Sequence, residues 1–162
     1  MKIMLTGHRP QKLGGFADNN PTRAKVIAKL EEVLRQAQQT NGDEPLIVIT
    51  GMALGCDQWW ALVALELGIP VHAYIPFTGQ EKKWPHASQK LYQSILERCD
   101  QIHIVSSGEY ESWKMQARNR AMVDAADICV AIWDTTSGGT ANCVQYIESQ
   151  KKPCLQINPG VL

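Results

Sequence analysis

Two glycine-rich stretches of the 162-residue chain have the composition of phosphate-binding loops. They are Gly51-Met52-Ala53-Leu54-Gly55-Cys56-Asp57 and Asp134-Thr135-Thr136-Ser137-Gly138-Gly139-Thr140. Glycines at the start of a helix let backbone N–H groups approach an anion, and the helix dipole adds partial positive charge there. Hydroxyl groups of Thr6, Ser137 and Thr140 would add hydrogen bonds. The alternative is that each glycine only permits a tight turn.

Two arginines accompany these stretches and favour phosphate binding over simple turns. Arg9 follows Thr6-Gly7-His8, and Arg118 precedes Asn119 on a segment with helical spacing. A guanidinium group offers forked, charge-assisted hydrogen bonds to phosphate. Neither glycine stretch is a Walker A motif or a G-x-G-x-x-G fingerprint. Ordinary kinase or dehydrogenase chemistry is therefore unsupported.

Asp57 has two interpretations, as the N-cap of a helix or as a contact for a ribose or base. No metal site is indicated, because the five cysteines are scattered without a C-x-x-C pair. The predicted ligand-binding residues are Thr6, Gly7, His8, Arg9, Gly51, Gly55, Asp57, Arg118, Asn119, Ser137, Gly138, Gly139 and Thr140.

Alternating strand and helix patterns would bring these residues together. The expected strands span 2–6, 46–50, 71–75, 101–105, 128–133 and 153–157, and the expected helices span about 22–41, 57–67, 87–98, 111–125 and 140–150. This alternation predicts an α/β protein of the Rossmann-like, doubly wound type, with a mainly parallel sheet of about six strands flanked by helices on both faces. Ligands bind beyond the carboxyl ends of such strands, where strand order reverses. No linker divides the chain, so residues 1–162 are expected to form one domain.

The equal numbers of basic and acidic residues argue against proteins that bind polyanions over a large surface. Sixteen Lys and Arg face sixteen Asp and Glu, so the formal net charge is zero. A protein that coats DNA or an anionic membrane needs a surplus of basic residues. Nucleic acid is therefore not the expected partner, although a local basic patch is compatible with this composition. No apolar run approaches the roughly 20 residues that span a bilayer, and scattered cysteines suit reduced thiols, so a cytoplasmic protein without a membrane partner is expected.

The apolar surface predicts self-association. Trp59, Trp60 and Trp113, with the apolar faces around Leu62, Val63 and Leu65, exceed the needs of one sheet face. Trp59 and Trp60 are adjacent, so one is expected in the core and the other at a surface or partner. A homodimer is the expectation.

Four motifs occur in the order seen in the SLOG superfamily. They are Thr6-Gly7-His8-Arg9; Thr50-Gly51-Met52-Ala53-Leu54-Gly55-Cys56-Asp57; Arg118-Asn119 followed by Met122-Val123-Asp124 and Asp127; and Ser137-Gly138-Gly139-Thr140-Ala141-Asn142. This superfamily groups the DNA-processing protein A (Smf) family with the Lonely Guy phosphoribohydrolases, and the chain most resembles its small YspA/YpsA-like members from bacteria or phage. The resemblance covers nearly the whole chain. It implies a Rossmann-like fold that binds a nucleotide or nucleotide-derived ligand between the first, second and fifth strand loops and the Arg118 helix.

The chain departs from the Lonely Guy pattern at two positions. The Pro-Gly-Gly-x-Gly-Thr-x-x-Glu motif of those enzymes has its glutamate where this chain has Cys143, and its proline where this chain has Ser137. Cleavage of a glycosidic bond passes through an oxocarbenium-like state that a carboxylate stabilises. The missing carboxylate favours a binding protein over an enzyme, and Arg118 would be the catalytic candidate in an enzyme. Asp134 or Asp57 could replace the glutamate if the fold brings one near the ribose.

The leading hypothesis is therefore binding or sensing of a nucleotide or NAD-derived molecule, with no cofactor required. In this hypothesis Gly138, Gly139 and Thr140 contact the phosphate. The first alternative is a phosphoribohydrolase-like enzyme acting on nucleoside monophosphates. The second is binding of single-stranded DNA, because the Gly51–Asp57 stretch also resembles the Ser-Gly-x-Ala-x-Gly-x-Asp motif of the DNA-processing family.

Overall fold

All 162 residues are described by the computed structural model, in which six parallel strands form one sheet. The strands are β1 (Lys2–Gly7), β2 (Ile47–Thr50), β3 (Val71–Ile75), β4 (Gln101–Ile104), β5 (Ile128–Ile132) and β6 (Cys154–Ile157). Their order across the sheet is β4-β3-β2-β1-β5-β6. The predicted doubly wound, Rossmann-like fold is confirmed, and the sheet is parallel throughout.

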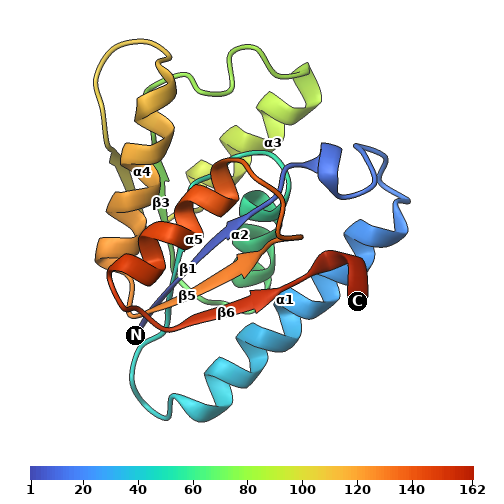
Figure 1. Ribbon diagram of the computed structural model, residues 1–162, viewed down its shortest axis with the longest axis vertical. Coiled ribbons are helices and arrows are strands. Elements are labelled where there is room, and N and C mark those ends of the chain that lie inside the picture. Colours follow the sequence, from blue (N-terminus) through green and yellow to red (C-terminus); the bar gives the residue numbers. More distant parts are fainter.

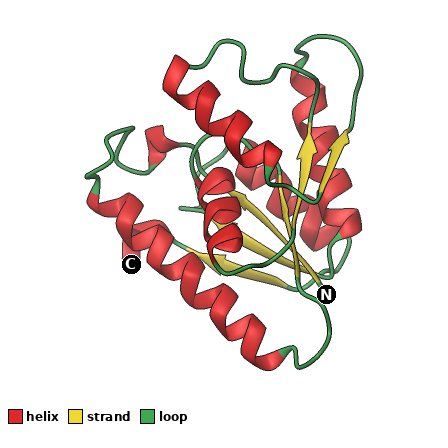
Figure 2. Ribbon diagram, turned by 180° about the vertical axis from the view of Figure 1, so that it is seen from behind, coloured by secondary structure: helices red, strands yellow, loops and turns green.

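Five helices cover the two faces of the sheet (Figures 1 and 2). They are α1 (Pro21–Thr40), α2 (Cys56–Glu66), α3 (His86–Glu97), α4 (Ser112–Ala125) and α5 (Gly139–Ser149), with short 3₁₀-helices η1 (Pro10–Lys12) and η2 (Pro159–Val161). Helix α2 packs against α1 and α3 in one layer, and α4 packs against α5 in the other. None of the helices is both long enough and apolar enough to span a lipid bilayer.

Local sequence explains how the longest helix begins and which side it buries. The Asn20 side chain caps α1 by accepting a hydrogen bond of 2.9 Å from the Thr22 N–H, and Pro21 occupies the first turn. Val26, Leu30 and Leu34 are fully buried at helical spacing. Their stripe packs into a core of 24 residues that also contains β1, β2 and β3 side chains, while a second core of eight residues lies under α4 and α5.

Two tryptophans are placed differently from the sequence-based expectation. Trp59 and Trp60 are both buried within the chain, with 7% and 0% of their surface exposed, and Val63 is buried beside them. The expectation that one of the pair covers a surface or partner was wrong, because α2 is enclosed by α1, α3 and the sheet. Trp113 is 57% exposed. Leu62 and Leu65, the other α2 residues behind the homodimer expectation, are partly buried, and the homodimer stays a prediction.

The strand order creates one switch point, where β1 lies between β2 and β5. The chain leaves β1 and enters α1 in one layer, whereas it leaves β5 and enters α5 in the other (Figure 1). The two connections therefore diverge and open a crevice at the carboxyl ends of these strands, where ligands of doubly wound proteins bind.

Candidate ligand-binding site

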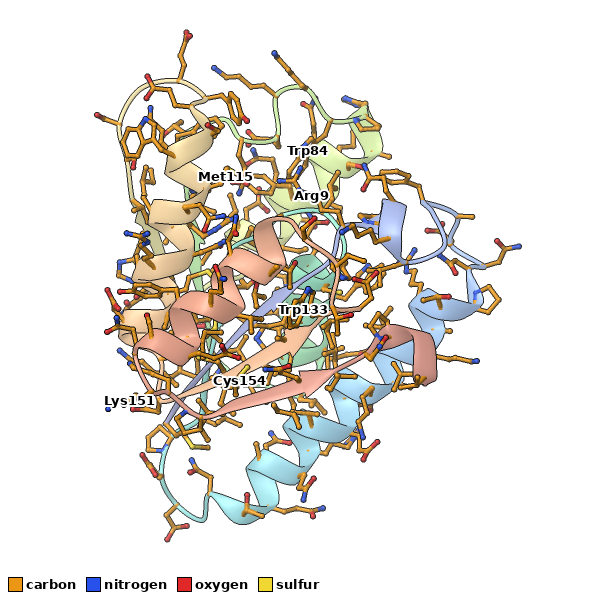
Figure 3. All side chains as sticks on the ribbon, in the orientation of Figure 1. Arg9, Trp84, Met115, Trp133, Lys151 and Cys154 are labelled. Carbon is orange, nitrogen blue, oxygen red and sulfur yellow. The ribbon has the colours of Figure 1, made fainter.

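A cavity of about 410 Å³ occupies this crevice. Its volume lies within the range of small-molecule sites, but its wall is more polar than usual. Only Ala53 and Met115 are hydrophobic among the 16 lining residues. The structure brings eleven predicted residues to this wall: Thr6, Gly7, His8, Arg9, Asp57, Arg118, Asn119, Ser137, Gly138, Gly139 and Thr140. Figure 3 labels two of the lining residues, Arg9 in the segment that follows β1 and Met115 on α4.

The β5–α5 connection presents backbone donors to the cavity. Gly138 precedes α5 with a φ of 140°, a conformation that favours glycine, and no side chain caps the helix. The first N–H groups of a helix have no partner within it. Gly139 and Thr140 begin α5 and line the cavity, so their N–H groups are suited to contact an anion.

Side chains from the β1–α1 segment tie the two diverging connections together. Lys12 Nζ donates hydrogen bonds of 2.6 Å to Thr136 Oγ1 and 3.1 Å to the Ser137 carbonyl oxygen. Its ammonium group also lines the cavity together with the exposed Arg9. Lys12 therefore stands beside the open N-terminus of α5, and Arg9 lines the same cavity.

His8 makes a second contact between the β1–α1 and β5–α5 segments. Its Nε2 lies 2.8 Å from Asp134 Oδ1 and 3.0 Å from the Asp134 backbone nitrogen. A protonated Nε2 donates to the carboxylate, whereas an unprotonated one accepts from the N–H. The Thr136 hydroxyl and N–H, followed by His8, hold the pKa of Asp134 below its usual value. Asp134 is thus an ionised anchor of the loop and does not line the cavity, so it does not replace the missing glutamate.

Arg118 is the most deeply placed cation of the cavity, with only 4% of its surface exposed. Its Nη1 donates a 2.5 Å hydrogen bond to the Gly51 carbonyl oxygen, and its Nε donates a 3.0 Å bond to Asn119 Oδ1. Nη2 has no hydrogen-bond partner within the chain. The guanidinium is therefore held on one side and free to bind an anion on the other.

Asp57 is the only acidic residue of the wall. It occupies the second position of α2 and Gly55 is the N-cap, so the N-cap interpretation was wrong. Asp57 Oδ2 accepts a 3.3 Å hydrogen bond from the Ala53 N–H, and Oδ1 has no partner within the chain. Burial raises the pKa of Asp57 to about 6, although Arg118 opposes this shift. The carboxyl group can therefore accept or donate a proton near neutral pH.

Gly51 and Gly55 lie behind the wall rather than on it. A Cβ at Gly51 would lie 2.6 Å from Arg118 Nη1, and one at Gly55 would lie 2.8 Å from the His8 carbonyl oxygen. Gly55 also has a φ of 90°. The same His8 carbonyl accepts the Cys56 N–H at 3.4 Å. This glycine stretch therefore positions Arg118 and His8, and of the two stretches only the β5–α5 one brings its glycines to the cavity wall.

Sequence reasoning missed five residues of the wall, which are Gln11, Lys12, Ala53, Met115 and Gln116. Met115 stands three residues before Arg118 on α4, and this spacing places both on one helix face. Lys12 stands three residues after Arg9 in the same glycine-bearing segment. Both spacings were visible in the sequence.

Cys143, at the position of the Lonely Guy glutamate, is fully buried in the second core and does not reach the cavity. Burial raises the pKa of its thiol to about 11. A neutral, enclosed thiol cannot stabilise a developing positive charge on a sugar.

Comparisons with known proteins identify the family of the chain and proteins that share its fold. The profile of the YspA SLOG family (YpsA) matches residues 3–159. A UPF0398 protein of Bacillus pumilus is 31% identical over 147 residues, covering 86% of this chain and 77% of that protein.

Two solved structures of DNA processing protein A share the fold. The Streptococcus pneumoniae protein has a TM-score of 0.68 at 20% identity and covers 97% of this chain. The Helicobacter pylori protein, described for its single-stranded DNA binding mode, has a TM-score of 0.66 at 18% identity and covers 98% of this chain. The chain spans only 50% and 65% of those two proteins.

Proposed function

The chain belongs to the YspA SLOG family, and from this premise we propose that its switch-point cavity binds a nucleotide or a nucleotide-derived molecule through a phosphate group. The observation that carries the proposal is the meeting of Arg9, Lys12 and Arg118 with the uncapped start of α5 in one polar cavity. Three cations face a single carboxyl group there, so the site complements an anion. A balanced total charge does not oppose such a local site.

Each part of the wall has a proposed role. The N–H groups of Gly138, Gly139 and Thr140 receive the phosphate oxygens, and Arg9 and Lys12 neutralise their charge. Arg118 donates from its free Nη2 on the other side of the cavity. Asp57 Oδ1 and the Asn119 amide contact a ribose hydroxyl or a base edge. No step of this binding requires a metal or another cofactor.

A thermal-shift screen tests the proposal. Nucleoside monophosphates, diphosphates and NAD fragments are added to the wild type, Arg118→Ala, Arg9→Ala and the control Arg98→Ala, whose exposed side chain forms no ion pair. A ligand raises the melting temperature by mass action. We expect at least one nucleotide to stabilise the wild type and Arg98→Ala, and to lose its effect in both other variants. Equal stabilisation of all four proteins would refute the site.

The cavity also supports a second candidate, hydrolysis of the N-glycosidic bond of a nucleoside monophosphate. The observation that favours it is Asp57, a cavity-facing carboxyl group with a pKa near 6. Such a group is suited to general acid–base catalysis at neutral pH. The test is incubation of nucleoside monophosphates with the wild type and Asp57→Asn, followed by analysis for free base and ribose 5-phosphate. Release of free base by the wild type but not by Asp57→Asn would support an enzymatic activity. No release at high protein concentration would exclude this activity.

Single-stranded DNA fits the cavity less well. Sequence-independent binding of single strands uses a basic groove with stacked aromatic side chains. The cavity wall contains no Phe, Tyr or Trp. We therefore keep the small nucleotide as the proposed ligand.

A further inference from the structure

A second cavity, of about 530 Å³, lies at the carboxyl ends of β3 and β4. It is formed by the segment between β3 and α3 and the segment between β4 and α4, which Figures 1 and 2 show at the same end of the molecule. Its lining residues are Phe77, Thr78, Gly79, Gln80, Lys82, Lys83, Glu109 and Tyr110. Gln80 among them hydrogen-bonds to the Gly51 stretch behind the first cavity.

Two aromatic rings form an apolar corner in this cavity. Phe77 is 6% exposed and Tyr110 is 65% exposed, and their ring centroids lie 5.9 Å apart at an interplanar angle of 72°. Aromatic rings gain by edge-to-face and offset contacts with further rings. The largely exposed face of Tyr110 is therefore available to an aromatic ligand.

The charged groups of the cavity favour an anion. Neither Lys82 nor Lys83 forms an ion pair within the chain. Glu109 is the only acid of the lining. Two ammonium groups and one carboxylate leave a surplus of positive charge beside the aromatic corner. A ligand that carries both an aromatic ring and an anionic group complements the rings and this charge.

The segment between β3 and α3, which carries both lysines, is held in place by hydrogen bonds within the chain. Gln89 of α3 donates from Nε2 to the Lys82 and Trp84 carbonyl oxygens at 3.2 and 2.9 Å. Gln80, which is 9% exposed, donates from Nε2 to the Gly51 carbonyl at 3.2 Å and to the Tyr92 hydroxyl at 3.3 Å. A preformed site loses less entropy on binding than a mobile one.

We propose that this second cavity is a binding site for an aromatic molecule that carries a phosphate or similar anionic group. The ring packs against Tyr110 and Phe77, and the anion pairs with Lys82 and Lys83. The site is separate from the switch-point cavity and does not depend on the ligand proposed there. The two are linked, because the Gly51 carbonyl accepts hydrogen bonds from both Gln80 and Arg118.

The experiment is an amide chemical-shift titration with 1-naphthyl phosphate, monitored by ¹⁵N–¹H NMR. The titration is repeated with Tyr110→Ala, with the double variant Lys82→Ala/Lys83→Ala, and with the control Lys90→Ala, an exposed lysine of α3 outside the cavity. Inorganic phosphate serves as the probe without a ring. Arg9→Ala, which changes an exposed residue of the first cavity wall, separates this cavity from the first one.

We expect saturable shifts at the Gly79 and Tyr110 amides and the Gln80 side-chain amide in the wild type, Lys90→Ala and Arg9→Ala. Affinity should fall about fivefold or more in Tyr110→Ala and in the double lysine variant. Shifts confined to Gly138 and Gly139, or shifts that vanish only in Arg9→Ala, would assign the probe to the first cavity and overturn the proposal. Equal affinity for inorganic phosphate would overturn the aromatic part.

Discussion

At the scale of single residues, the first cavity depends on one buried guanidinium and on the space left for it. Arg118 is 4% exposed, and its Nη1 reaches a carbonyl oxygen 67 positions away in the sequence. Gly51 supplies that carbonyl and, by lacking a side chain, also leaves room for the guanidinium. A buried charge is expensive unless it is hydrogen-bonded. Both the fold and the site therefore depend on this contact.

Gly51→Ala is predicted to destabilise the protein by about 1–3 kcal/mol, because its Cβ would lie 2.6 Å from Arg118 Nη1. Gly139→Ala is the matched comparison, since a Cβ there meets nothing within 4 Å. Urea unfolding of both variants measures the difference. A cost for Gly51→Ala no larger than that for Gly139→Ala would contradict this account of Arg118.

Asp57 predicts a dependence of stability on pH. Its pKa rises from 3.8 to about 6 on folding, so the folded state holds a proton that the unfolded state has released. Stability from this group is therefore present below about pH 4 and is lost as pH rises through 6. Asp57→Asn should gain stability relative to the wild type across that window, by at most about 3 kcal/mol. Urea unfolding at intervals from pH 4 to 7 measures the gain, and a constant difference would refute the shifted pKa.

At the scale of elements, the site depends on contacts between two connections that leave the sheet on opposite faces. The β1–α1 segment contributes Lys12 and His8, and the β5–α5 segment contributes Thr136 and Asp134. These contacts hold the N-terminus of α5 beside the cations of the neighbouring segment. The anion site is thus a property of the pair of connections.

Lys12→Ala is predicted to weaken binding of a phosphorylated ligand about tenfold, because it removes a cation and the tie to the α5 loop. The free energy of unfolding should change by less than about 1 kcal/mol, since the lysine is exposed. Lys25→Ala, an exposed lysine of α1 without an ion pair, is the control. Calorimetric titration with the nucleotide selected by the thermal-shift screen measures both affinities. Equal nucleotide affinities of Lys12→Ala and Lys25→Ala would show that Lys12 does not contact the ligand.

At the scale of the whole molecule, sixteen basic and sixteen acidic residues leave no net charge. Binding of single-stranded DNA draws much of its affinity from counterion release along many phosphates. We therefore predict no saturable binding of a fluorescein-labelled oligonucleotide, measured by anisotropy at low salt. Tight binding with a steep salt dependence would contradict the small-ligand assignment and favour the DNA-binding alternative.

The strand–helix alternation and most of the first cavity wall could be predicted from the sequence, because both depend on patterns of neighbouring residues. Hydrophobic runs marked the strands, and glycines with arginines marked the strand ends. The supporting contacts were not predictable in this way. The Gly51 carbonyl meets Arg118 and Gln80 only through the fold, and the burial of both Trp59 and Trp60 depends on how α2 is enclosed. Contacts between distant positions leave no periodic signal in one sequence.

The central claim is that a phosphate binds between the start of α5 and Arg118. Its most direct measurement is the ¹⁵N–¹H titration of the protein with the nucleotide that stabilises it most. We predict saturable shifts of the Gly138, Gly139 and Thr140 amides, and their loss in Arg118→Ala. Saturable binding that leaves these three amides unmoved would contradict the claim.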